Sequence, residues 1–541
     1  MGPLAADGAG NAPEAGAALT ARVTPAQVRL ALIARREIAL IDLREEDPFA
    51  RAHPLFAACL PLSRLELEVF DRIPRRDAPI VLYDDGEGLV EPAAERLAAL
   101  GYSDVRALAG GLGGWRDAGY ELFQDVNSYA KAFGELVESR RHTPSFAAEE
   151  LDALIKAKAD IVVLDARRWD EYRTMNIPTG VSVPGAELVL RARDLAPDPA
   201  TTIVVNCAGR TRSIIGAQSL INAGLPNRVA ALRNGAIGWT LAGRSLEHGQ
   251  DRRFPDASPG HLDEARDKAR AVAYRAGVRR ITVAELADLQ RDRARSLYRF
   301  DVRTPEEYSR GHIPGFRSAP GGQLVQETDM FAPVRGARIV LADDLGPRAD
   351  MTASWLAQMG WDAFVLDGGF DGDLETGEWR PERPATPSVP TISGSALAEA
   401  FAGGAVSVID VGPSPAHRKA HIPGAWFAIR ARLGGALDAL PKDRPVVVTS
   451  PDGELAAFAA HDLAGCGLDV GALAGGTAAW IAAGLATETG LPRPATAPED
   501  VYRRPYEGAD HAAEAKQAYL DWEYGLVDQL ARDGTHGFFV I

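Results

Sequence analysis

Cys207 is the residue whose place in the sequence points most directly to chemistry. It follows the apolar residues 203–205 and Asn206 and precedes a helical stretch, separated from it by Ala208, Gly209, Arg210, Thr211, Arg212 and Ser213. This order predicts a buried strand, a tight loop and a helix, with the thiol facing the free amides at the helix N-terminus. The amides, the helix dipole, Arg210 and Arg212 are expected to favour the thiolate, the nucleophilic form of cysteine. Of the three cysteines, only Cys207 has this setting.

Composition indicates a multidomain globular protein. The chain has 541 residues, too many for one core, with 46% hydrophobic and 25% charged residues. A net charge of −15 argues against nucleic-acid or anionic-membrane partners, because both select basic surfaces. No apolar run is long enough for a membrane span, and residues 1–19 lack the features of a secretory signal, so we expect a disordered tail there. The few cysteines suit a reducing cytoplasm.

One sequence unit occurs four times along the chain. Each copy has a hydrophobic strand that ends in an aspartate: Asp42, Asp165, Asp301 and Asp410. A second apolar strand ends at Asp84, Cys207, Asp343 or Ser450 and is followed by a helical segment, a third strand and a glycine-rich turn. Strands that alternate with helical stretches indicate a parallel sheet with helices on both faces. We therefore expect an α/β fold of four tandem domains, at 20–124, 142–252, 278–384 and 388–489.

Linkers and a tail complete the expected organisation. We predict a polar helical linker around 125–141, a second helix at 259–277 and a Pro-rich linker at 380–390. The C-terminal tail, 490–541, contains a candidate amphipathic helix at 510–532. Its aromatic and apolar residues are expected to pack on a domain or a partner: Tyr519, Leu520, Trp522 and Tyr524.

The front of the repeat carries a recognisable motif. The third copy has Asp301-Val-Arg303, then Glu307-Tyr308 and Gly311-His312-Ile-Pro-Gly315. The second has Asp165-Ala-Arg167 and Glu171-Tyr172, and the fourth keeps His421-Ile-Pro-Gly424. These motifs, over most of residues 20–489, resemble the rhodanese-like (thiosulfate sulfurtransferase) superfamily. The resemblance implies four tandem rhodanese-like domains, each a central parallel sheet with helices on both faces.

The resemblance also implies a reaction. Cys207 would attack the outer sulfur of thiosulfate or a similar donor, release sulfite and hold a persulfide until a thiol or protein acceptor removes the sulfur. The amides of Ala208, Gly209, Arg210, Thr211, Arg212 and Ser213 would cradle the sulfur, and the two arginines would stabilise its negative charge. Arg212 matches the basic residue that commonly closes the loop in single-domain members, so we expect it to have the stronger role. Gly209 departs from the pattern, because many members have glycine one position later.

The other three copies lack the nucleophile. Asp84, Asp343 and Ser450 stand where Cys207 does, and none can hold a sulfane sulfur. A carboxylate at this position can accept the hydrogen bonds of the loop amides, so Asp84 and Asp343 are expected to fill their loops as built-in anions. We expect these copies to be structural or partner-binding. Acid–base or metal work by an Asp-Asp pair is the alternative.

Other residues are interpreted as structural. Arg167 and Arg303 are expected to pair with Glu171 and Glu307, and Cys466 to pack in the core. Cys59 could be a resolving thiol, but we favour a structural role. His53, His312 and His421 are interpreted as structural, as are the tryptophans after the glycine-rich turns: Trp115, Trp239 and Trp480. The histidines show no metal-ligand spacing, so no metal and no cofactor is expected.

Two other functions remain open. A phosphatase or arsenate reductase on the same fold would use a cysteine, five residues and then an arginine. Here Ser213 occupies that last position and Arg212 comes one residue earlier, so the loop is shorter. The second alternative is a non-enzymatic scaffold in which Cys207 carries sulfur passively. The physiological donor, the acceptor and the oligomeric state stay undetermined.

Overall fold

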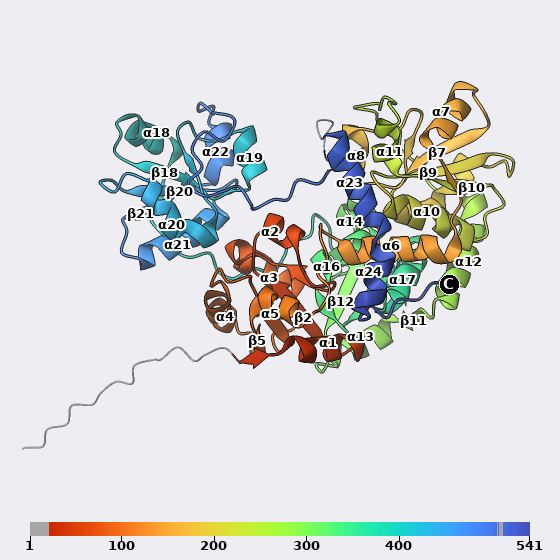
Figure 1. The fold of residues 1–541 in the computed structure, drawn as a ribbon, viewed down its shortest axis with the longest axis horizontal. Helices are drawn as coiled ribbons and strands as arrows, with labels where there is room; N and C mark the ends of the chain where they lie inside the picture. Colours follow the sequence, from red (N-terminus) through yellow and green to blue (C-terminus); the bar gives the residue numbers. More distant parts are fainter. Residues whose placement is uncertain (1–20, 506, 508–511) are drawn as a thin grey trace, which may run out of the picture.

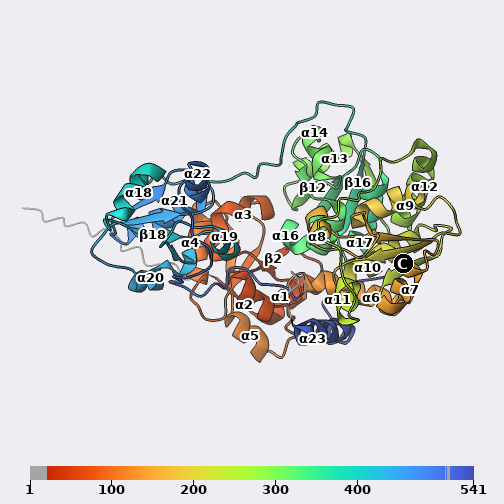
Figure 2. The same ribbon diagram turned by 90° about the horizontal axis from the view of Figure 1, so that it is seen from above.

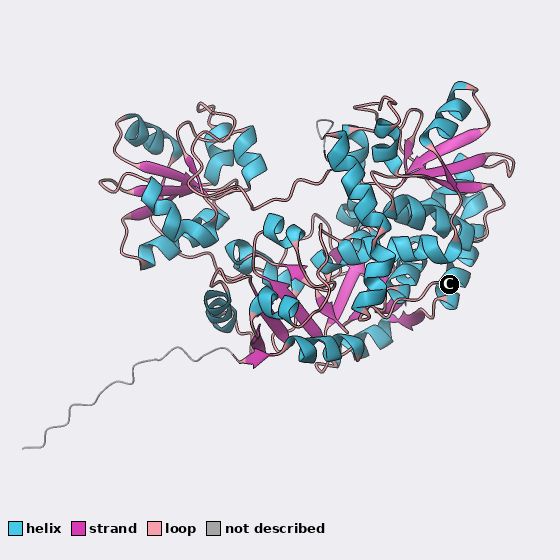
Figure 3. Cartoon of the chain, viewed as in Figure 1, coloured by secondary structure: helices cyan, strands magenta, loops and turns pink. Residues whose placement is uncertain are grey.

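Four β-sheets follow one another along the chain in the computed structural model, which describes residues 21–505, 507 and 512–541 (Figure 1). We call each sheet with its helices a module, numbered in chain order. The strands lie inside and the helices outside (Figure 3). This confirms the predicted α/β architecture of four tandem units. The expected tail at 1–19 lies outside the described residues.

The second module shows why the sequence forms this sheet. Its strands are all parallel, in the order β6 (Ser145–Phe146), β10 (Val229–Leu232), β9 (Thr202–Asn206), β7 (Ile161–Asp165) and β8 (Val181–Ser182). Successive side chains of a strand point to opposite faces. Accordingly, Ile203 and Val205 pack with α9 (Leu188–Leu195) and α10 (Thr211–Asn222). Val204 packs on the other face with α7 (Ala148–Lys156) and α11 (Gly235–Leu241). Both faces are covered, so the centre of the strand, residues 203–205, is hydrophobic on both sides.

The third and fourth sheets repeat this strand order. The third runs β11 (Arg279–Thr282), β16 (Asp362–Asp367), β15 (Arg338–Ala342), β12 (Leu297–Asp301) and β13 (Arg317–Ser318). The fourth runs β17 (Thr391–Ile392), β21 (Val470–Leu473), β20 (Val446–Thr449), β18 (Ser407–Asp410) and β19 (Trp426–Phe427). Their helices are α13 (Val283–Arg291), α14 (Pro305–Arg310), α15 (Gly321–Gln326), α16 (Thr328–Phe331), α17 (Pro347–Gln358), α18 (Gly394–Ala402), α19 (Ser414–Lys419), α20 (Leu433–Ala436), α21 (Glu454–Gly465) and α22 (Gly476–Ala482).

The first sheet includes a strand from another module. Its parallel strands are β1 (Arg22–Val23), β5 (Val105–Leu108), β4 (Ile80–Tyr83), β2 (Ile38–Asp42) and β3 (Ala58–Cys59). Its helices are α1 (Pro25–Ile33), α2 (Glu46–Arg51), α3 (Leu65–Arg72), α4 (Val90–Ala99) and α5 (Gly111–Asp117). At its edge β14 (Val334–Arg335), which comes from the third module, pairs antiparallel with β2. The first and third modules therefore share one sheet, which the repeat pattern did not predict.

The helix predicted around 125–141 is confirmed as α6 (Ser128–Arg141). It is buried from Ser128 to Val137 and packs on α10 of the second module. Its polar residues find partners inside the protein: Lys131 pairs with Asp125 at 3.0 Å, and Glu135 pairs with Arg210 at 2.7 Å. The segment that joins the first two modules is therefore also part of the core. The helix predicted at 259–277 is confirmed as α12 (Pro259–Arg275), which packs against α9 and α17.

The C-terminal tail returns to the second module. The helix predicted at 510–532 is two helices, α23 (Ala513–Tyr524) and α24 (Leu526–Asp533), which meet at Gly525 and lie beside α6 (Figure 1). Tyr519 and Leu520 are buried against Ile237, as predicted, whereas Tyr524 is exposed.

Seen from above, the fourth module lies at the end of the molecule beside the first, far from the second and third (Figure 2). A buried ion pair between Arg430 and Glu66 joins it to the first module, at 2.7 Å. Short helices complete three of the modules. The second also has α8 (Trp169–Thr174) and η2 (Gly185–Glu187). The first has η1 (Leu62–Arg64), and the fourth has η3 (Arg430–Arg432) and η4 (Leu437–Ala439). Among the described helices, none has the length and apolar character needed to span a membrane.

Candidate active site

Cys207 lies between the end of β9 and the start of α10, as predicted. Its side chain is buried, with 2% of the residue exposed. The sulfur lies 3.5 Å from the Ser213 hydroxyl, which in turn donates to the Arg210 carbonyl at 2.8 Å. The loop is thus closed by contacts between its own residues, and the thiol lies at the N-terminus of α10.

The start of α11 locks this loop from behind. Ala236 and Ile237 donate their backbone N–H groups to the carbonyls of Cys207 and Ala208, both at 2.9 Å. Gly235 makes this approach possible, since a Cβ there would lie 2.4 Å from the Cys207 carbonyl oxygen. Its φ of +52° also belongs to the left-handed region that favours glycine. The glycine-rich turn after the third strand therefore supports the loop that holds the thiol.

The corresponding loops of the first and third modules contain their own anions. Asp343 accepts backbone hydrogen bonds from Leu345, Arg348 and Ala349, at 3.1, 2.9 and 3.3 Å. Asp84 accepts them from Gly86 at 3.1 Å and from Leu89 at 2.6 Å. The predicted built-in anions are confirmed.

The fourth module fills its loop with a hydroxyl. Ser450 accepts a hydrogen bond from the Ala456 backbone at 3.1 Å. In the first, third and fourth modules, backbone amides near the start of the helix donate hydrogen bonds to the side chain that follows the strand. In the second module that side chain is a thiol.

Arg212 and Glu171 form a two-hydrogen-bond ion pair at the rim of the Cys207 loop, with N–O distances of 2.7 and 2.8 Å. Burial opposes ionisation of Glu171, but the Arg212 charge outweighs burial and lowers the pKa of Glu171 to about 2. Arg348 and Glu307 form the equivalent pair in the third module, at 2.7 Å.

The pairing predicted for Arg167 and Arg303 was wrong. Arg167 binds Asp165 at 2.7 Å and the Met175 carbonyl at 2.6 Å. Arg303 binds Asp301 in the same way, at 2.7 Å. The aspartate that ends each strand lies two residues before the arginine and is the nearer carboxylate. Glu171 and Glu307 are therefore left to pair with the arginines of the loops.

Arg210 turns away from the sulfur. Its guanidinium makes two hydrogen bonds to Glu135 of α6, both 2.7 Å, and a third to Asn234 at 3.0 Å. Its outer face covers the Tyr524 ring, 4.2 Å from the centroid. The expectation that both arginines stabilise a thiolate thus needs correction: Arg210 is neutralised by Glu135, and Arg212 is the arginine that favours the Cys207 thiolate.

The protonation state of Cys207 also differs from the expectation. Burial raises the pKa of the Cys207 thiol, although Arg212 and hydrogen bonds from Ser213 oppose this. Desolvation disfavours the charged form of any buried acid. In this closed arrangement the loop alone does not make a thiolate, because the elements packed on it exclude water.

Two clefts flank the loop. The first, about 470 Å³, is lined by Ala208 and Arg212 together with Asn127, Arg168, Glu171 and Gln326. The second, about 280 Å³, is lined by Arg210 and Ser213 together with Asn234 and Tyr524. Thr211 faces a small cavity between the second and third modules, and Gly209 lies under Tyr519 and Glu523 of α23. Of the six predicted loop residues, Arg212 and Ser213 act on the Cys207 thiol, whereas Arg210 binds Glu135 and Asn234.

Comparison with known proteins decides the family. A model of the rhodanese-like domain matches residues 24–118, 147–242, 282–375 and 393–483. The chain belongs to the rhodanese-like family. The crystal structure of thiosulfate sulfurtransferase from Pseudomonas aeruginosa is 60% identical, with a TM-score of 0.95, over 96% of this chain and 100% of that chain.

Shorter rhodanese-like structures match single modules. A rhodanese-related protein from Thermoplasma volcanium is 23% identical over 18% of this chain and 97% of its own, with a TM-score of 0.17. The rhodanese-like domain of the Alr3790 protein from Anabaena is 29% identical over 19% and 80%, with a TM-score of 0.18. Comparison with curated protein sequences gave no match.

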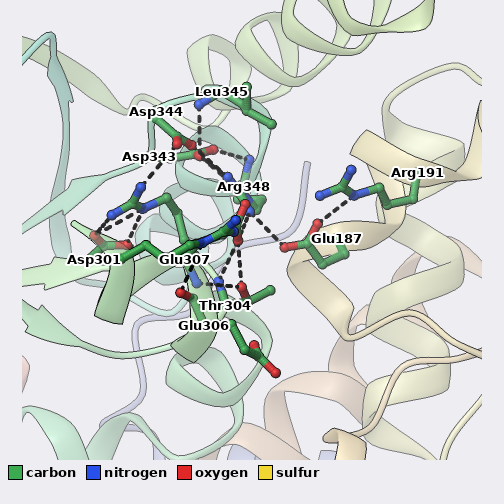
Figure 4. A network of polar contacts seen from close by, with 12 residues as sticks. Glu187, Arg191, Asp301, Thr304, Glu306, Glu307, Asp343, Asp344, Leu345 and Arg348 are labelled. Atoms are coloured by element: carbon green, nitrogen blue, oxygen red, sulfur yellow. Dashed lines mark hydrogen bonds and ion pairs between the residues drawn. The ribbon is translucent and has the colours of Figure 1, made fainter. Parts of the chain in front are cut away.

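The third rhodanese-like module is tied to the second through its own filled loop (Figure 4). Arg348 is fully buried and contacts Asp343 at 2.8 Å within the loop. It also contacts Glu187 of the second module at 3.0 Å. Glu187 is held in turn by Arg191 at 2.9 Å. The loop that would hold sulfur in an active module here holds a network of charges that joins two modules.

The remaining predicted residues have structural surroundings. Cys466 is exposed at the end of α21, so the prediction of core packing was wrong; this helix end faces solvent. Cys59 is buried in β3 of the first module, where burial raises its pKa. Trp239 is buried and donates to the Ser245 carbonyl at 2.8 Å, as expected of a core anchor. The His53 ring contacts backbone carbonyls of Pro54 and Asp125, both at 2.9 Å. Within the described residues, no His, Cys, Asp and Glu side chains gather as a metal site would require.

Three residues beside the Cys207 loop were not predicted to belong to the site: Glu171, Glu135 and Glu523. Glu171 could have been found, because only the second and third repeats have both this glutamate and the loop arginine with which it pairs. Glu135 and Glu523 gave no such signal. They come from α6 and α23, outside the repeat, and reach the loop only in the folded structure.

Proposed function

We propose that the protein is a sulfurtransferase that moves a sulfane sulfur from thiosulfate or a similar donor to a thiophilic acceptor through a persulfide on Cys207. The observation that carries the proposal is the Cys207 loop, in which Arg212 and Ser213 at the start of α10 favour a thiolate, whereas the other three loops are filled by their own oxygens. The relative that is 60% identical is named a thiosulfate sulfurtransferase.

The proposed reaction has two displacements. The Cys207 thiolate attacks the outer sulfur of thiosulfate; the sulfur–sulfur bond of the donor breaks, and sulfite leaves with the bonding pair. The outer sulfur of the resulting persulfide is then attacked by an acceptor thiolate, and Cys207 departs as a thiolate. Both enzyme states are anionic, so the loop amides and Arg212 favour them.

The thiol must lose its proton before the first displacement. Burial raises the pKa of Cys207 and Arg212 lowers it; we propose that the proton leaves to water and that Arg212 offsets the repulsion between the thiolate and the donor dianion. The cleft lined by Ala208 and Arg212 offers the donor a route to the loop. No metal or cofactor takes part in these steps.

The partners follow from the chemistry. We propose a small-molecule donor and a thiol or protein acceptor, and a cytoplasmic location, since Cys207 must stay reduced. The three modules without a cysteine would build the molecule around the active one. The Arg348 network supports this structural role for the third module.

The test is the mass of the protein after incubation with thiosulfate. We expect a gain of one sulfur atom on the Cys207 peptide of the wild type, lost on later addition of a thiol or cyanide, and no gain in Cys207→Ser. If neither thiosulfate nor mercaptopyruvate loads sulfur on Cys207, the proposal fails and the scaffold alternative gains. Hydrolysis of a phenyl phosphate by the wild type but not by Cys207→Ser would support the phosphatase alternative.

A further inference from the structure

The C-terminal helix α23 covers the Cys207 loop. Its Tyr519 and Glu523 lie directly on Gly209, where a Cβ would be 3.2 Å from a Tyr519 ring carbon and 3.3 Å from Glu523 Oε2. The helix is fixed by Leu520, which is buried against Ile237 of α11. Tyr524 at its end donates a hydrogen bond to Asn234 at 3.0 Å. A segment more than three hundred residues from Cys207 in the sequence thus forms part of its surroundings.

The Glu523 carboxyl group is buried and incompletely satisfied. Only 1% of the residue is exposed. Oε1 accepts a hydrogen bond from the Tyr519 hydroxyl at 2.8 Å, whereas Oε2 finds no hydrogen-bond partner among the described residues. Leaving a buried charged oxygen without a donor is costly, so this arrangement favours the neutral carboxylic acid.

The charged groups that face Glu523 do not offset its burial. Lys131 and Glu135 face it from α6, and Arg210 and Cys207 from the loop. Lys131 is paired with Asp125, and Arg210 with Glu135. Burial therefore dominates and raises the pKa of Glu523 to about 8, while Lys131 acts in the opposite direction. The carboxyl group is neutral at neutral pH.

The ionisation of Glu523 acts on Cys207. Burial is the largest cause that raises the pKa of Cys207, and negative charge on Glu523 raises it further. Like charges in a shared buried site oppose each other's formation. A neutral Glu523 removes this repulsion from the loop that must carry a thiolate and a persulfide.

We propose that Glu523 is a positioning residue of the Cys207 site: as an acid it lets the loop hold a negative sulfur, and as a carboxylate it suppresses that state. The role in sulfur transfer rests on the proposed function. The effect on ionisation of the Cys207 thiol does not, and it can be measured separately.

The first measurement is the rate of Cys207 alkylation by iodoacetamide against pH, followed by peptide mapping. We expect Glu523→Gln to shift the rise in rate to lower pH, with alkylation at about pH 9 faster by roughly tenfold, which corresponds to one pKa unit. Exposed Cys466 is an internal standard in the same sample and should keep its rate. Glu514→Gln, an exposed change on the same helix, is the matched control and should follow the wild type.

The second measurement is sulfur uptake from thiosulfate over the same pH range. We expect uptake by the wild type to fall above about pH 8, where Glu523 ionises, and uptake by Glu523→Gln to continue rising. Glu523→Met is neutral as well and must give the same alkylation shift if the glutamine variant folds poorly. Identical Cys207 alkylation profiles in the wild type and the neutral variants would overturn the proposal. A shifted alkylation profile without sulfur uptake in any variant would support the Glu523 assignment and overturn the sulfurtransferase function.

Discussion

Arg212 and Glu171 hold each other in a parallel pair at the mouth of the Cys207 loop, 2.7 and 2.8 Å apart. The arginine comes from the loop that carries the thiol, and the glutamate from α8, which follows the neighbouring strand. Because both terminal nitrogens of the guanidinium are hydrogen-bonded, its orientation is already fixed, and little side-chain entropy is lost when an anion binds beside it. The pair fixes the one arginine that favours the thiolate.

Loss of Arg212 should slow persulfide formation. In Arg212→Ala we expect single-turnover sulfur uptake from thiosulfate to fall by about 10²-fold, because the positive charge that favours thiolate and donor is gone. Arg212→Lys should recover only part of the rate, since lysine keeps the charge but not the two-armed pair. Arg173→Ala, an exposed arginine on the helix of Glu171, is the control. Equal rates in Arg212→Ala and Arg173→Ala would show that Arg212 has no part in the reaction.

Two glycines allow a matched test of the loop support, one at the first position of α11 and one two residues after its end. Gly235 and Gly243 both have positive φ, +52° and +70°, but a Cβ would collide with the Cys207 carbonyl only at Gly235. Gly243 has nothing within 4 Å. Both alanine variants should lose about 1 kcal/mol from the backbone conformation. Gly235→Ala should lose more and should also lose sulfur uptake, while Gly243→Ala keeps it. Denaturant unfolding and intact mass measure the two effects, and equal losses in both variants would contradict the role of Gly235.

The sequence allowed the position of the thiol to be predicted, because strand, loop and helix are encoded locally. Residues 203–205 are continuously hydrophobic, and the alternation of their contacts follows from strand geometry. Four repeats of the same pattern made the fold class predictable too. The same local pattern allowed us to predict that Asp84 and Asp343 fill their own loops, because a carboxylate at a helix N-terminus accepts hydrogen bonds from the free amides there.

Pairing partners and contacts between modules were not predictable in this way. Arg167 had two carboxylates within a short stretch of sequence, and only geometry selects Asp165 over Glu171. α6 looked polar because Lys131 and Glu135 pair inside the protein. β14 is two residues long and joins the sheet of another module. These features depend on how distant segments dock, which no local pattern records.

Removal of the Asp343 carboxylate should destabilise the third module. Asp343→Ala removes one of the four carboxylates that contact the fully buried Arg348, and it leaves the loop amides of Leu345, Arg348 and Ala349 without their acceptor. A buried donor that loses its acceptor costs about 1–3 kcal/mol. We expect the melting temperature to fall, and sulfate or thiosulfate to restore part of it by occupying the emptied loop. Asp373→Ala, an exposed aspartate of the same module, should melt like the wild type with or without sulfate. A variant that melts like the wild type would show that the built-in anion is not needed.

The stability of the protein should depend on pH through Glu523. The folded state raises the pKa of this carboxyl to about 8, above the value of about 4.3 expected for an unfolded glutamate. The contribution of Glu523 to the free energy of unfolding is therefore fully present below about pH 4.3 and is lost as the pH rises to about 8. Glu523→Gln cannot ionise, so we expect it to unfold at higher denaturant concentration than the wild type at about pH 9, by on the order of a few kcal/mol. At about pH 5 the two proteins should differ much less. Glu514→Gln should follow the wild type at both pH values, because that side chain is exposed. A difference between Glu523→Gln and the wild type that stays constant with pH would mean that Glu523 is ionised throughout, and that its proton does not control the Cys207 loop.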